Sequence, residues 1–211
     1  MKLADMTWEE AKGIRTAIVP VGSIEQHGPH LPLSTDSLIV ESVSEFLSQK
    51  LKAVITPVIA PGVSFEHLDF HGTLTLKEET LLDEISEVCS SLRKHGVEDI
   101  LVVNGHGGNR NALLRLKIPG VKYLDIIRQI PGYDHAGEIE TSLMLYIHPE
   151  KVRKHAIRKH EFRFPGKGPW RTIEHSKSGV LGDPTLATAE KGKAYFERIT
   201  SGIISELGHG N

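Results

Sequence analysis

Residues 16–37 read TAIVPVGSIEQHGPHLPLSTDS, and the character of this stretch changes twice. Its first seven residues, TAIVPVG, form a β-branched apolar run that predicts a buried strand. The polar segment that follows contains Pro29 and Pro32, which exclude an ordinary helix interior. Helical spacing then begins at Asp36. A strand, a polar loop and a helix in direct succession are the building unit of an α/β fold.

The same succession recurs along the chain. Further strands are predicted at residues 53–59, 99–105 and 121–127, and a polar loop follows each of them. Helices are predicted at residues 36–51, 78–94, about 109–116, 137–147 and from near 182 to about 207. This alternation predicts a three-layer α/β/α fold with a mostly parallel sheet. No linker divides the chain, so residues 1–211 are expected to form one domain.

Composition and charge exclude several classes of protein. The formal net charge of -2, from 25 basic and 27 acidic residues, provides no electrostatic footprint for nucleic acid or for an anionic membrane surface. No run approaches the roughly 20 apolar residues of a membrane span, and the first residues show no apolar signal segment. The single cysteine, Cys89, excludes an internal disulfide and has the helical spacing of a core residue. We therefore expect a soluble protein of the reducing cytoplasm.

Histidines are concentrated in the loops that follow the predicted strands. Ligand sites of open α/β sheets lie beyond the carboxyl ends of the strands. The segments at these places read SIEQHGPHLPLSTD, PGVSFEHLDFHGT, NGHGGN and GYDHAGEIETS. They contain six of the 12 histidines: His27, His30, His67, His71, His106 and His135. Half of the histidines are thus predicted to meet at one edge of the sheet.

Four of the residues in these loops have the types and spacing of a metal site. Glu25 and His27 are two apart, so their side chains point to the same side of an extended backbone. Asp36 lies at the start of the next predicted helix, and His106 is flanked by glycines that allow a close approach of the backbone. Imidazole and carboxylate ligands together suit zinc, manganese or iron, and a carboxylate such as Asp36 can bridge two ions about 3.5–4 Å apart.

Each of these residues also has a structural interpretation. Asp36 alone fits the N-cap of the following helix, and a lone His27 or His106 fits a hydrogen-bonded loop histidine. The GHGG sequence fits a phosphate-binding turn, although it lacks the G-x-G-x-x-G spacing. The other loop histidines fit a role near a substrate and a structural role equally well: His30, His67 and His71. A metal site is favoured because the structural interpretation needs an unrelated reason in each of four loops.

Four segments in this order resemble the signature segments of the creatininase family: GSIEQHGPHLPLSTD, NGHGGN, HAGEIETS and GVLGDPTLATAEKG. The resemblance implies a dinuclear metal-dependent amidohydrolase with a creatininase-like fold, assembled as a homo-oligomer, a hexamer. It implies that Glu25, His27, Asp36 and His106 bind two divalent ions, with Asp36 as the bridge. The same matching makes Glu140 a further ligand or a catalytic carboxylate, and it makes His135 a proton-transfer residue.

The chain also departs from the creatinine-hydrolysing members of that family. Those members have a segment similar to NGHYEN where this chain has NGHGGN. Gly108 therefore stands where they supply a carboxylate to the second metal. Glu140 is expected to compensate for this missing carboxylate. Only 28 residues separate His106 from His135 and none is a tryptophan, whereas those members have a longer segment with substrate-covering tryptophans. His71 stands where relatives often have proline and is expected to alter the substrate pocket. These departures argue against creatinine as the substrate.

The resemblance leaves three amidohydrolase activities open. They are deformylation of the formylamino-pyrimidine ribotide in flavin and deazaflavin synthesis, ring opening of creatinine, and clipping of the mycofactocin precursor peptide. The compact chain favours the first, and a non-peptide amide is the expected substrate. Hydroxide from the metal pair is expected to attack the carbonyl, with the backbone N–H groups of Gly107 and Gly108 as oxyanion partners. The non-enzymatic alternative is a metal-binding protein without catalysis, although structural zinc sites are usually closed and rich in cysteine.

The stretch 153–177 is rich in basic residues, glycine and proline, and it is expected to form a long ordered loop or lid. Its cationic side chains fit the binding of a ribotide phosphate and, equally, a solvated basic face. They are Arg153, Lys154, Arg158, Lys159, Arg163, Lys167 and Arg171.

Overall fold

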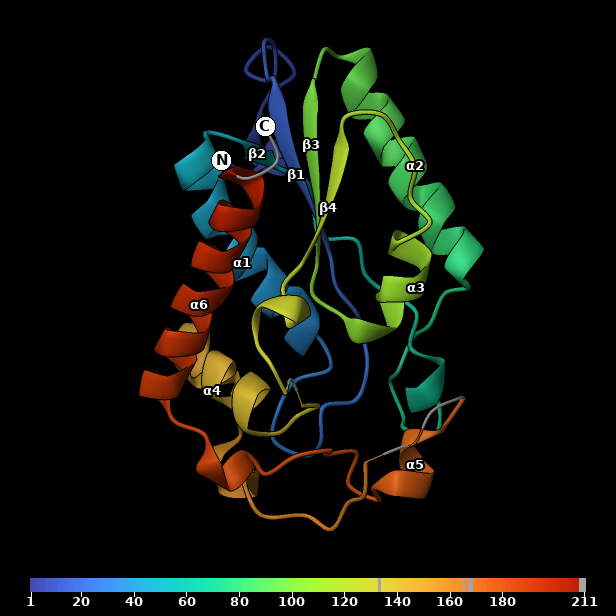
Figure 1. Ribbon diagram of the computed structural model, residues 1–211, viewed down its shortest axis with the longest axis vertical. Coiled ribbons are helices and arrows are strands. Elements are labelled where there is room, and N and C mark those ends of the chain that lie inside the picture. Colours follow the sequence, from blue (N-terminus) through green and yellow to red (C-terminus); the bar gives the residue numbers. More distant parts are fainter. Residues whose placement is uncertain (133, 165, 167–168, 209–211) are drawn as a thin grey trace.

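Four parallel strands form a sheet in the order β2-β1-β3-β4 in the computed structural model, which describes residues 1–132, 134–164, 166 and 169–208 (Figure 1). The strands are β1 (Thr16–Val21), β2 (Val54–Ile55), β3 (Asp99–Asn104) and β4 (Val121–Asp125). β1 and β3 pair along their whole length in the centre of the sheet. The predicted α/β class with a parallel sheet is therefore confirmed.

Helices cover both faces of this sheet (Figure 1). One layer consists of α1 (Thr35–Leu51), α4 (Glu138–Ile147) and α6 (Ala189–Gly208). The other layer consists of α2 (Glu78–Lys94) and α3 (Arg110–Leu113). The bounds of α2 coincide with the predicted 78–94, and the three-layer α/β/α arrangement is confirmed.

Alternate residues of the strands fill two hydrophobic cores. In β1, Ile18 is buried on the side of α1, α4 and α6, whereas its neighbours Ala17 and Val19 are buried on the side of α2. Cys89 of α2 has no exposed surface in this second core, which confirms its predicted place in the interior. The strands are buried on both faces, and this is why they have nearly continuous apolar sequences.

Three predicted elements are shorter in the structure than in the sequence pattern. β2 keeps only two residues of the predicted 53–59, because Pro57 has no N–H to donate to a strand ladder. The predicted helix at 109–116 begins with the 3-10 turn η3 (Gly107–Asn109), and its α-helical part ends at Leu113. α6 begins at Ala189 rather than near residue 182, because a separate 3-10 turn, η7 (Pro184–Leu186), precedes it.

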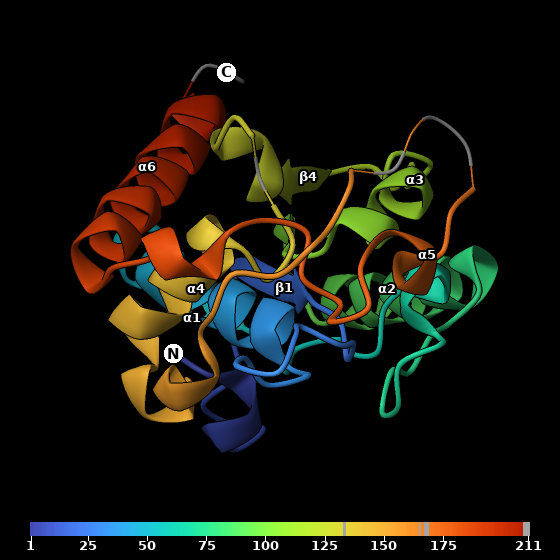
Figure 2. The same cartoon turned by 90° about the horizontal axis from the view of Figure 1, so that it is seen from below.

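The segments that leave the carboxyl ends of the strands gather at one end of the sheet (Figures 1 and 2). They contain two short elements that bear on the site, η2 (Phe65–His67) and α5 (Thr172–His175). The other short elements are 3-10 turns: η1 (Leu3–Asp5), η4 (Ile127–Gln129), η5 (Pro149–Lys151) and η6 (Lys154–Ala156). Among the described residues, none of the helices has both the length and the apolar character of a membrane span.

Candidate metal centre

Five buried side chains meet beyond the carboxyl ends of the strands, and all five are predicted metal ligands. Two follow β1, one follows β3, and two lie in the first turns of α1 and α4. Each residue is at most 5% exposed. The five are Glu25, His27, His106, Asp36 and Glu140. The topology therefore brings together residues that lie up to about half of the chain apart in the sequence.

Asp36 lies at the centre of this cluster. Its Oδ1 is 3.3 Å from His27 Nε2, and its Oδ2 is 2.9 Å from His106 Nδ1. Glu140 Oε2 lies 3.4 Å from the same nitrogen of His27, and Glu25 Oε2 lies 3.2 Å from His106 Nε2. Two groups of three potential ligand atoms within 4.8 Å of one another share Asp36: Glu25, Asp36, His106 and His27, Asp36, Glu140.

The hydrogen bonds of the two histidine rings fit metal binding. His27 Nδ1 donates to the carbonyl oxygen of Glu25 at 3.1 Å, so its Nε2 faces the carboxylates of Asp36 and Glu140. His106 Nε2 lies 2.8 Å from the carbonyl oxygen of Val63, to which it donates, and its Nδ1 faces Asp36. A backbone acceptor behind one ring nitrogen and carboxylates in front of the other are typical of metal-binding histidines.

The charge of the cluster also fits cations. Burial raises the pKa of Glu25 to about 7. At His106, burial lowers the pKa, but the carboxylates of Glu25 and Asp36 outweigh it and raise the value to about 10. At His27, burial is outweighed by Glu140 and Asp36, and the pKa lies well above its usual range. Protonated rings thus balance the buried carboxylates, a role that divalent cations take over where such residues bind metal.

One oxygen of the Glu25 carboxylate also lacks a hydrogen-bond donor to balance its charge, within the part of the chain that the structure describes. Glu25 Oε1 is buried without a hydrogen bond among the described residues, whereas its Oε2 accepts one from Ser64 Oγ at 2.5 Å. Leaving a buried carboxylate oxygen without a partner is costly. The residues present therefore fit divalent cations that take mixed oxygen and nitrogen ligands.

Asp36 does not cap α1, which was its structural alternative. Its carboxylate accepts a hydrogen bond from Ser23 Oγ at 2.9 Å and faces two histidine rings. Among the described residues, none of the hydrogen bonds of this carboxylate comes from an N–H of α1. Ser34 occupies the N-cap position instead. The helix therefore positions Asp36 for the cluster rather than using it as a cap.

Two asparagines hold the loop of His106 in place. The Asn104 side chain donates to the carbonyl oxygen of His106 at 2.8 Å and accepts from its N–H at 3.2 Å. Asn109 accepts from the N–H of Val63 at 2.8 Å and donates to the carbonyl oxygen of Gly22 at 2.9 Å. Sequence reasoning missed both residues, although they are the two asparagines of NGHGGN. They tie the loops after β1, β2 and β3 together.

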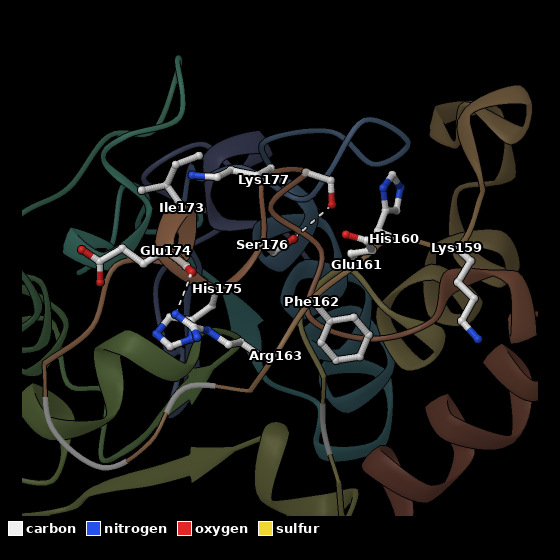
Figure 3. Close-up of a pocket in the computed structure, with 11 residues that line it drawn as sticks. Lys159, His160, Glu161, Phe162, Arg163, Ile173, Glu174, His175, Ser176 and Lys177 are labelled. Carbon is white, nitrogen blue, oxygen red and sulfur yellow. Dashed lines mark hydrogen bonds between the residues drawn. The ribbon is translucent and has the colours of Figure 1, made fainter.

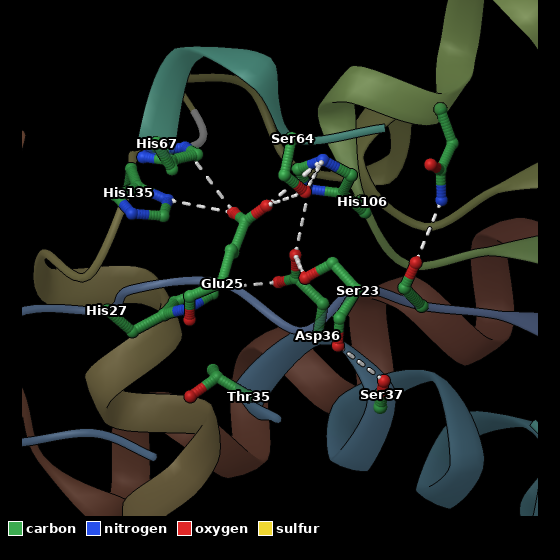
Figure 4. Close-up of polar contacts among 12 residues, drawn as sticks. Ser23, Glu25, His27, Thr35, Asp36, Ser37, Ser64, His67, His106 and His135 are labelled. Carbon is green, nitrogen blue, oxygen red and sulfur yellow. Dashed lines mark hydrogen bonds and ion pairs between the residues drawn. The ribbon is translucent and has the colours of Figure 1, made fainter. Parts of the chain in front are cut away.

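His135, the predicted proton-transfer residue, lies at the edge of the cluster. Its Nδ1 is 3.7 Å from Glu25 Oε1, and its ring lies 4.5 Å from that of His27 and 4.4 Å from that of His67. Figure 4 shows His67 and His135 on one side of the Glu25 carboxylate, opposite His106. Burial lowers the pKa of His135 well below its usual value, so the ring is neutral.

A cavity of about 410 Å³ opens onto the cluster. Gly107 and Gly108 line it, as expected of substrate-binding positions. The structure does not bring His71 to this cavity, because His71 lies in an exposed turn after η2 and is absent from the lining. His67, from η2 itself, lines the cavity instead and is 3% exposed.

Two aromatic residues of the basic stretch 153–177, Phe164 and Trp170, also line this cavity. The stretch is tied to η2, since Arg171 forms a salt bridge with Asp69 and Thr172 Oγ1 lies 2.8 Å from His67 Nδ1. Sequence analysis missed the two aromatic residues because nothing in their spacing connects them with the histidine-rich loops. A tryptophan therefore lies beside the site, although the segment between the two signature histidines contains none.

A second cavity, of about 520 Å³, lies on the basic stretch itself. Lys159, Arg163 and Lys177 lie apart around it, and Glu161 and Glu174 line the same cavity (Figure 3). This mixture of charges favours the solvated basic face over a phosphate-binding cluster. One basic residue of the prediction, Lys167, lies outside the described residues.

Gly108 is expected to be indispensable for the shape of the site, whereas Gly107 is not. A Cβ atom at position 108 would lie 2.0 Å from Val63 O and 2.6 Å from His106 Nε2, but one at position 107 would meet nothing closer than 3.8 Å. We expect Gly108→Ala to lower the free energy of unfolding by about 1–3 kcal/mol and Gly107→Ala by less than about 1 kcal/mol. Urea unfolding of the metal-free proteins measures both, and equal stabilities would contradict this account.

Comparisons with known proteins identify the family of the chain. The creatininase family model, described as creatinine amidohydrolase, matches residues 4–207. A mycofactocin precursor peptide peptidase of Mycobacterium tuberculosis is 36% identical over 210 residues, covering 90% of this chain and 83% of that protein. Creatinine amidohydrolase of Pseudomonas putida is 26% identical, covering 97% and 95%. A 2-amino-5-formylamino-6-ribosylaminopyrimidin-4(3H)-one 5'-monophosphate deformylase of Methanobrevibacter ruminantium is 35% identical over 97 residues, covering 45% and 41%.

Solved structures show the same fold. A crystal structure of creatinine amidohydrolase (creatininase) superposes with a TM-score of 0.89 at 24% identity, covering 99% of this chain and 96% of that chain. Solved creatininases include a manganese form and a mutant of Zn-Zn type. Because the family model spans nearly the whole chain and a relative of 36% identity shares most of its length, the chain belongs to the creatininase family of amide-hydrolysing enzymes.

Proposed function

We propose that the protein hydrolyses a non-peptide amide, a formamide or a cyclic amide, with two divalent cations. One cation would be held by Glu25, Asp36 and His106, and the other by His27, Asp36 and Glu140. The observation that carries this proposal is the central position of Asp36, whose two oxygens face His27 and His106 at 3.3 and 2.9 Å. A carboxylate shared in this way is the usual bridge of a two-metal hydrolase.

Bound cations supply Lewis acidity and lower the pKa of water at such a site. The residues of the chain supply the remaining functions. His135 Nε2 is 2.9 Å from the carbonyl oxygen of Gln26, to which it donates, so Nδ1 is free to accept a proton. Protonation of the departing nitrogen then needs a nearby acid, and the protonated His135 is that acid. The N–H groups of Gly107 and Gly108 are the proposed partners of the oxyanion.

Gly108 and Glu140 together account for the departure from creatinine-hydrolysing relatives. A side chain at position 108 would collide with the carbonyl oxygen of Val63. A carboxylate therefore does not fit there without moving the backbone. Glu140 is buried and 3.4 Å from His27, and in this proposal it would supply the missing carboxylate from α4.

A second candidate substrate is a peptide bond near the end of a chain. Two observations favour it: the 36% identity with a mycofactocin precursor peptide peptidase, and a further cavity of about 360 Å³ beside the metal cavity. The two cavities share Glu66, Gly108 and Trp170. Their combined lining would accommodate a substrate longer than a formamide or a small ring.

A substrate panel with metal removal tests the proposal. The protein, loaded with zinc or manganese, is incubated with an N-formylaminopyrimidine, creatinine and a synthetic peptide, and the products are measured by mass spectrometry. We expect hydrolysis of the formamide, a loss of at least about 100-fold after chelation, and recovery when the ion is returned. Cleavage of the peptide alone would support the second candidate. Two bound ions without hydrolysis of any amide would support the non-enzymatic alternative.

We also propose iron as an alternative ion, a cytoplasmic location and assembly into a homo-hexamer. An apolar hollow of about 870 Å³ on the surface of α1, α4 and α6 supports the assembly, because hollows of this kind commonly mark contacts between proteins. Its aromatic and aliphatic lining includes Phe46, Tyr146, Phe196 and Ile204.

A further inference from the structure

His67 is a buried histidine in the wall of the metal cavity, and it has no role in the chemistry proposed above. It comes from η2, lines the metal cavity and is 3% exposed. Its ring stacks on that of His135 at 4.4 Å with an interplanar angle of 23°, and the ring of Trp170 stands edge-on to it at 6.2 Å. These contacts hold the orientation of the His67 ring.

The amide of Gln26 determines which nitrogen of His67 carries the hydrogen. Gln26 Oε1 accepts from the N–H of Gly28 at 3.0 Å, and Gln26 Nε2 donates to the carbonyl oxygen of Gly179 at 3.0 Å. These two bonds exclude the flipped amide. The Nε2 group can only donate, and it has two hydrogens for three neighbours: the carbonyl oxygen of Gly179, His67 Nδ1 at 2.9 Å and His135 Nε2 at 2.7 Å. His135 Nε2 carries its own hydrogen, because it donates to the carbonyl oxygen of Gln26, so the second hydrogen of the amide goes to His67 Nδ1. His67 Nδ1 must therefore be an acceptor.

Thr172 acts on the same nitrogen. Its Oγ1 lies 2.8 Å from His67 Nδ1, and a hydroxyl can donate to an unprotonated ring nitrogen. With Nδ1 unprotonated, a neutral His67 carries its hydrogen on Nε2. This is a preorganised donor, because the hydrogen position is fixed by protein groups before any ligand enters.

The Nε2–H group of His67 is available to a ligand in the cavity. The nearest carboxylate oxygen, Glu25 Oε1, is 3.4 Å away, and the pair does not meet the geometry of a hydrogen bond. Among the described residues, His67 Nε2 makes no hydrogen bond. A neutral donor beside the proposed metal ligands is the type of group that stabilises a developing negative charge.

We propose that His67 is a further catalytic residue, whose Nε2–H donates a hydrogen bond to the carbonyl oxygen of the substrate amide, and that Gln26 and Thr172 hold it in this tautomer. This inference rests on the proposed function. The donor position lies across the Glu25 carboxylate from His106 (Figure 4). The carbonyl oxygen would thus be contacted by a neutral imidazole from η2 in addition to the glycine-rich turn after β3.

A spectroscopic experiment tests the tautomer without any substrate. Nitrogen-15 NMR of the zinc-loaded protein distinguishes protonated from unprotonated ring nitrogens, and His67→Gln identifies the signals of His67. We expect an unprotonated Nδ1 and a protonated Nε2 for His67. The double variant Gln26→Met, Thr172→Val should disturb this tautomer. The signals of His30 serve as an internal reference, because the Nε2 of that ring contacts a different residue, Thr141 Oγ1, at 2.8 Å. A proton on Nδ1 of His67 in the unaltered protein would overturn the proposal.

A binding experiment tests the donor role. The probe is acetohydroxamate, an amide-like ligand for metal hydrolases, measured by calorimetry on zinc-loaded proteins. His67→Phe keeps an aromatic ring but removes the donor, and we expect binding about tenfold weaker or more. His67→Gln, which places an N–H near the same position, should recover most of the affinity. His95→Phe, at an exposed histidine after α2, is the matched control and should bind like the unaltered protein.

The zinc content of each variant separates this inference from the proposed function. Unchanged zinc with weaker probe binding supports the donor role of His67. Loss of zinc from His67→Phe would show that His67 orients Glu25 instead, which overturns the donor role. Equal probe affinity in all variants would also overturn it. Failure of the unaltered protein to bind zinc at all would instead refute the proposed function.

Discussion

Asp36→Ala is expected to lose both of the proposed metal ions, since Asp36 belongs to two of the three groups of potential ligand atoms among the described residues. Its two oxygens face His27 and His106 separately, at 3.3 and 2.9 Å, as expected of a carboxylate that bridges two ions. Loss of a shared ligand would remove one bond at each ion. Replacing a residue that only supports a metal ligand typically weakens metal binding by about 10–100-fold, so the loss of the ligand itself should weaken it by at least about 100-fold. Zinc retained after dialysis against a zinc buffer, measured by elemental analysis, checks this result.

Two further variants make the Asp36 experiment specific. Asp36→Asn keeps the size of the side chain and removes its charge, so it distinguishes lost ligation from lost packing. Asp83→Ala removes the same charge from an exposed position on α2 and should retain two ions per chain. Retention of two ions with unchanged affinity in Asp36→Ala would disprove the bridging role. The thermal stability of the metal-free forms shows whether either substitution has unfolded the protein.

The fold could be predicted because strand and helix patterns depend on local burial. The helix at 78–94 has apolar residues at helical spacing and ends before Gly96, whose positive φ of 89° suits a glycine after a helix. The strand at 53–59 was predicted too long because the apolar run continues through Pro57, which cannot pair in the ladder. The pattern therefore indicated the position of each element more reliably than its length.

The cluster could also be predicted, because parallel strands carry the residues after them to one edge of the sheet. Glu25, His27 and His106 follow the two central strands, and Asp36 lies in the first turn of α1, which follows β1, so the topology brings them together. Their roles as ligands remain a prediction. The membership of the creatininase family, in contrast, is confirmed.

The wall of the cavity could not be predicted in this way. His67 and Trp170 lie on segments whose course is set by side-chain contacts, such as the hydrogen bond between Thr172 and His67, rather than by strand register. His71 was expected to alter the substrate pocket because it stands where relatives often have proline, but His67 of the same loop lines the cavity instead. Only the 3-10 turn η2 decides which of the two faces inward. Residues that act through such loops have no periodic signal in a single sequence.

Glu140→Gln is expected to lower turnover by at least about 100-fold while leaving the fold intact, by the usual range for a lost proton-transfer group or ligand. Glu140 Oε2 accepts from the N–H of Ala136 at 2.6 Å and lies 3.4 Å from His27 Nε2. Glutamine keeps the size of the side chain and removes the charge that makes this group fit a cation. Because Glu140 belongs to only one of the two groups that share Asp36, we expect this variant to retain about one ion per chain rather than none.

The ion count and the turnover number of Glu140→Gln together assign the role of this carboxylate. One ion per chain with slow turnover would identify Glu140 as the ligand that replaces the carboxylate missing at Gly108. Two ions with slow turnover would identify it as a proton carrier. Glu138→Gln is the matched control, since Glu138 lies on the same helix but pairs with Lys191 at 3.0 Å and accepts from Tyr195 at 2.9 Å, outside the cluster. Near-normal turnover with two ions in Glu140→Gln would show that this carboxylate takes no part in the chemistry.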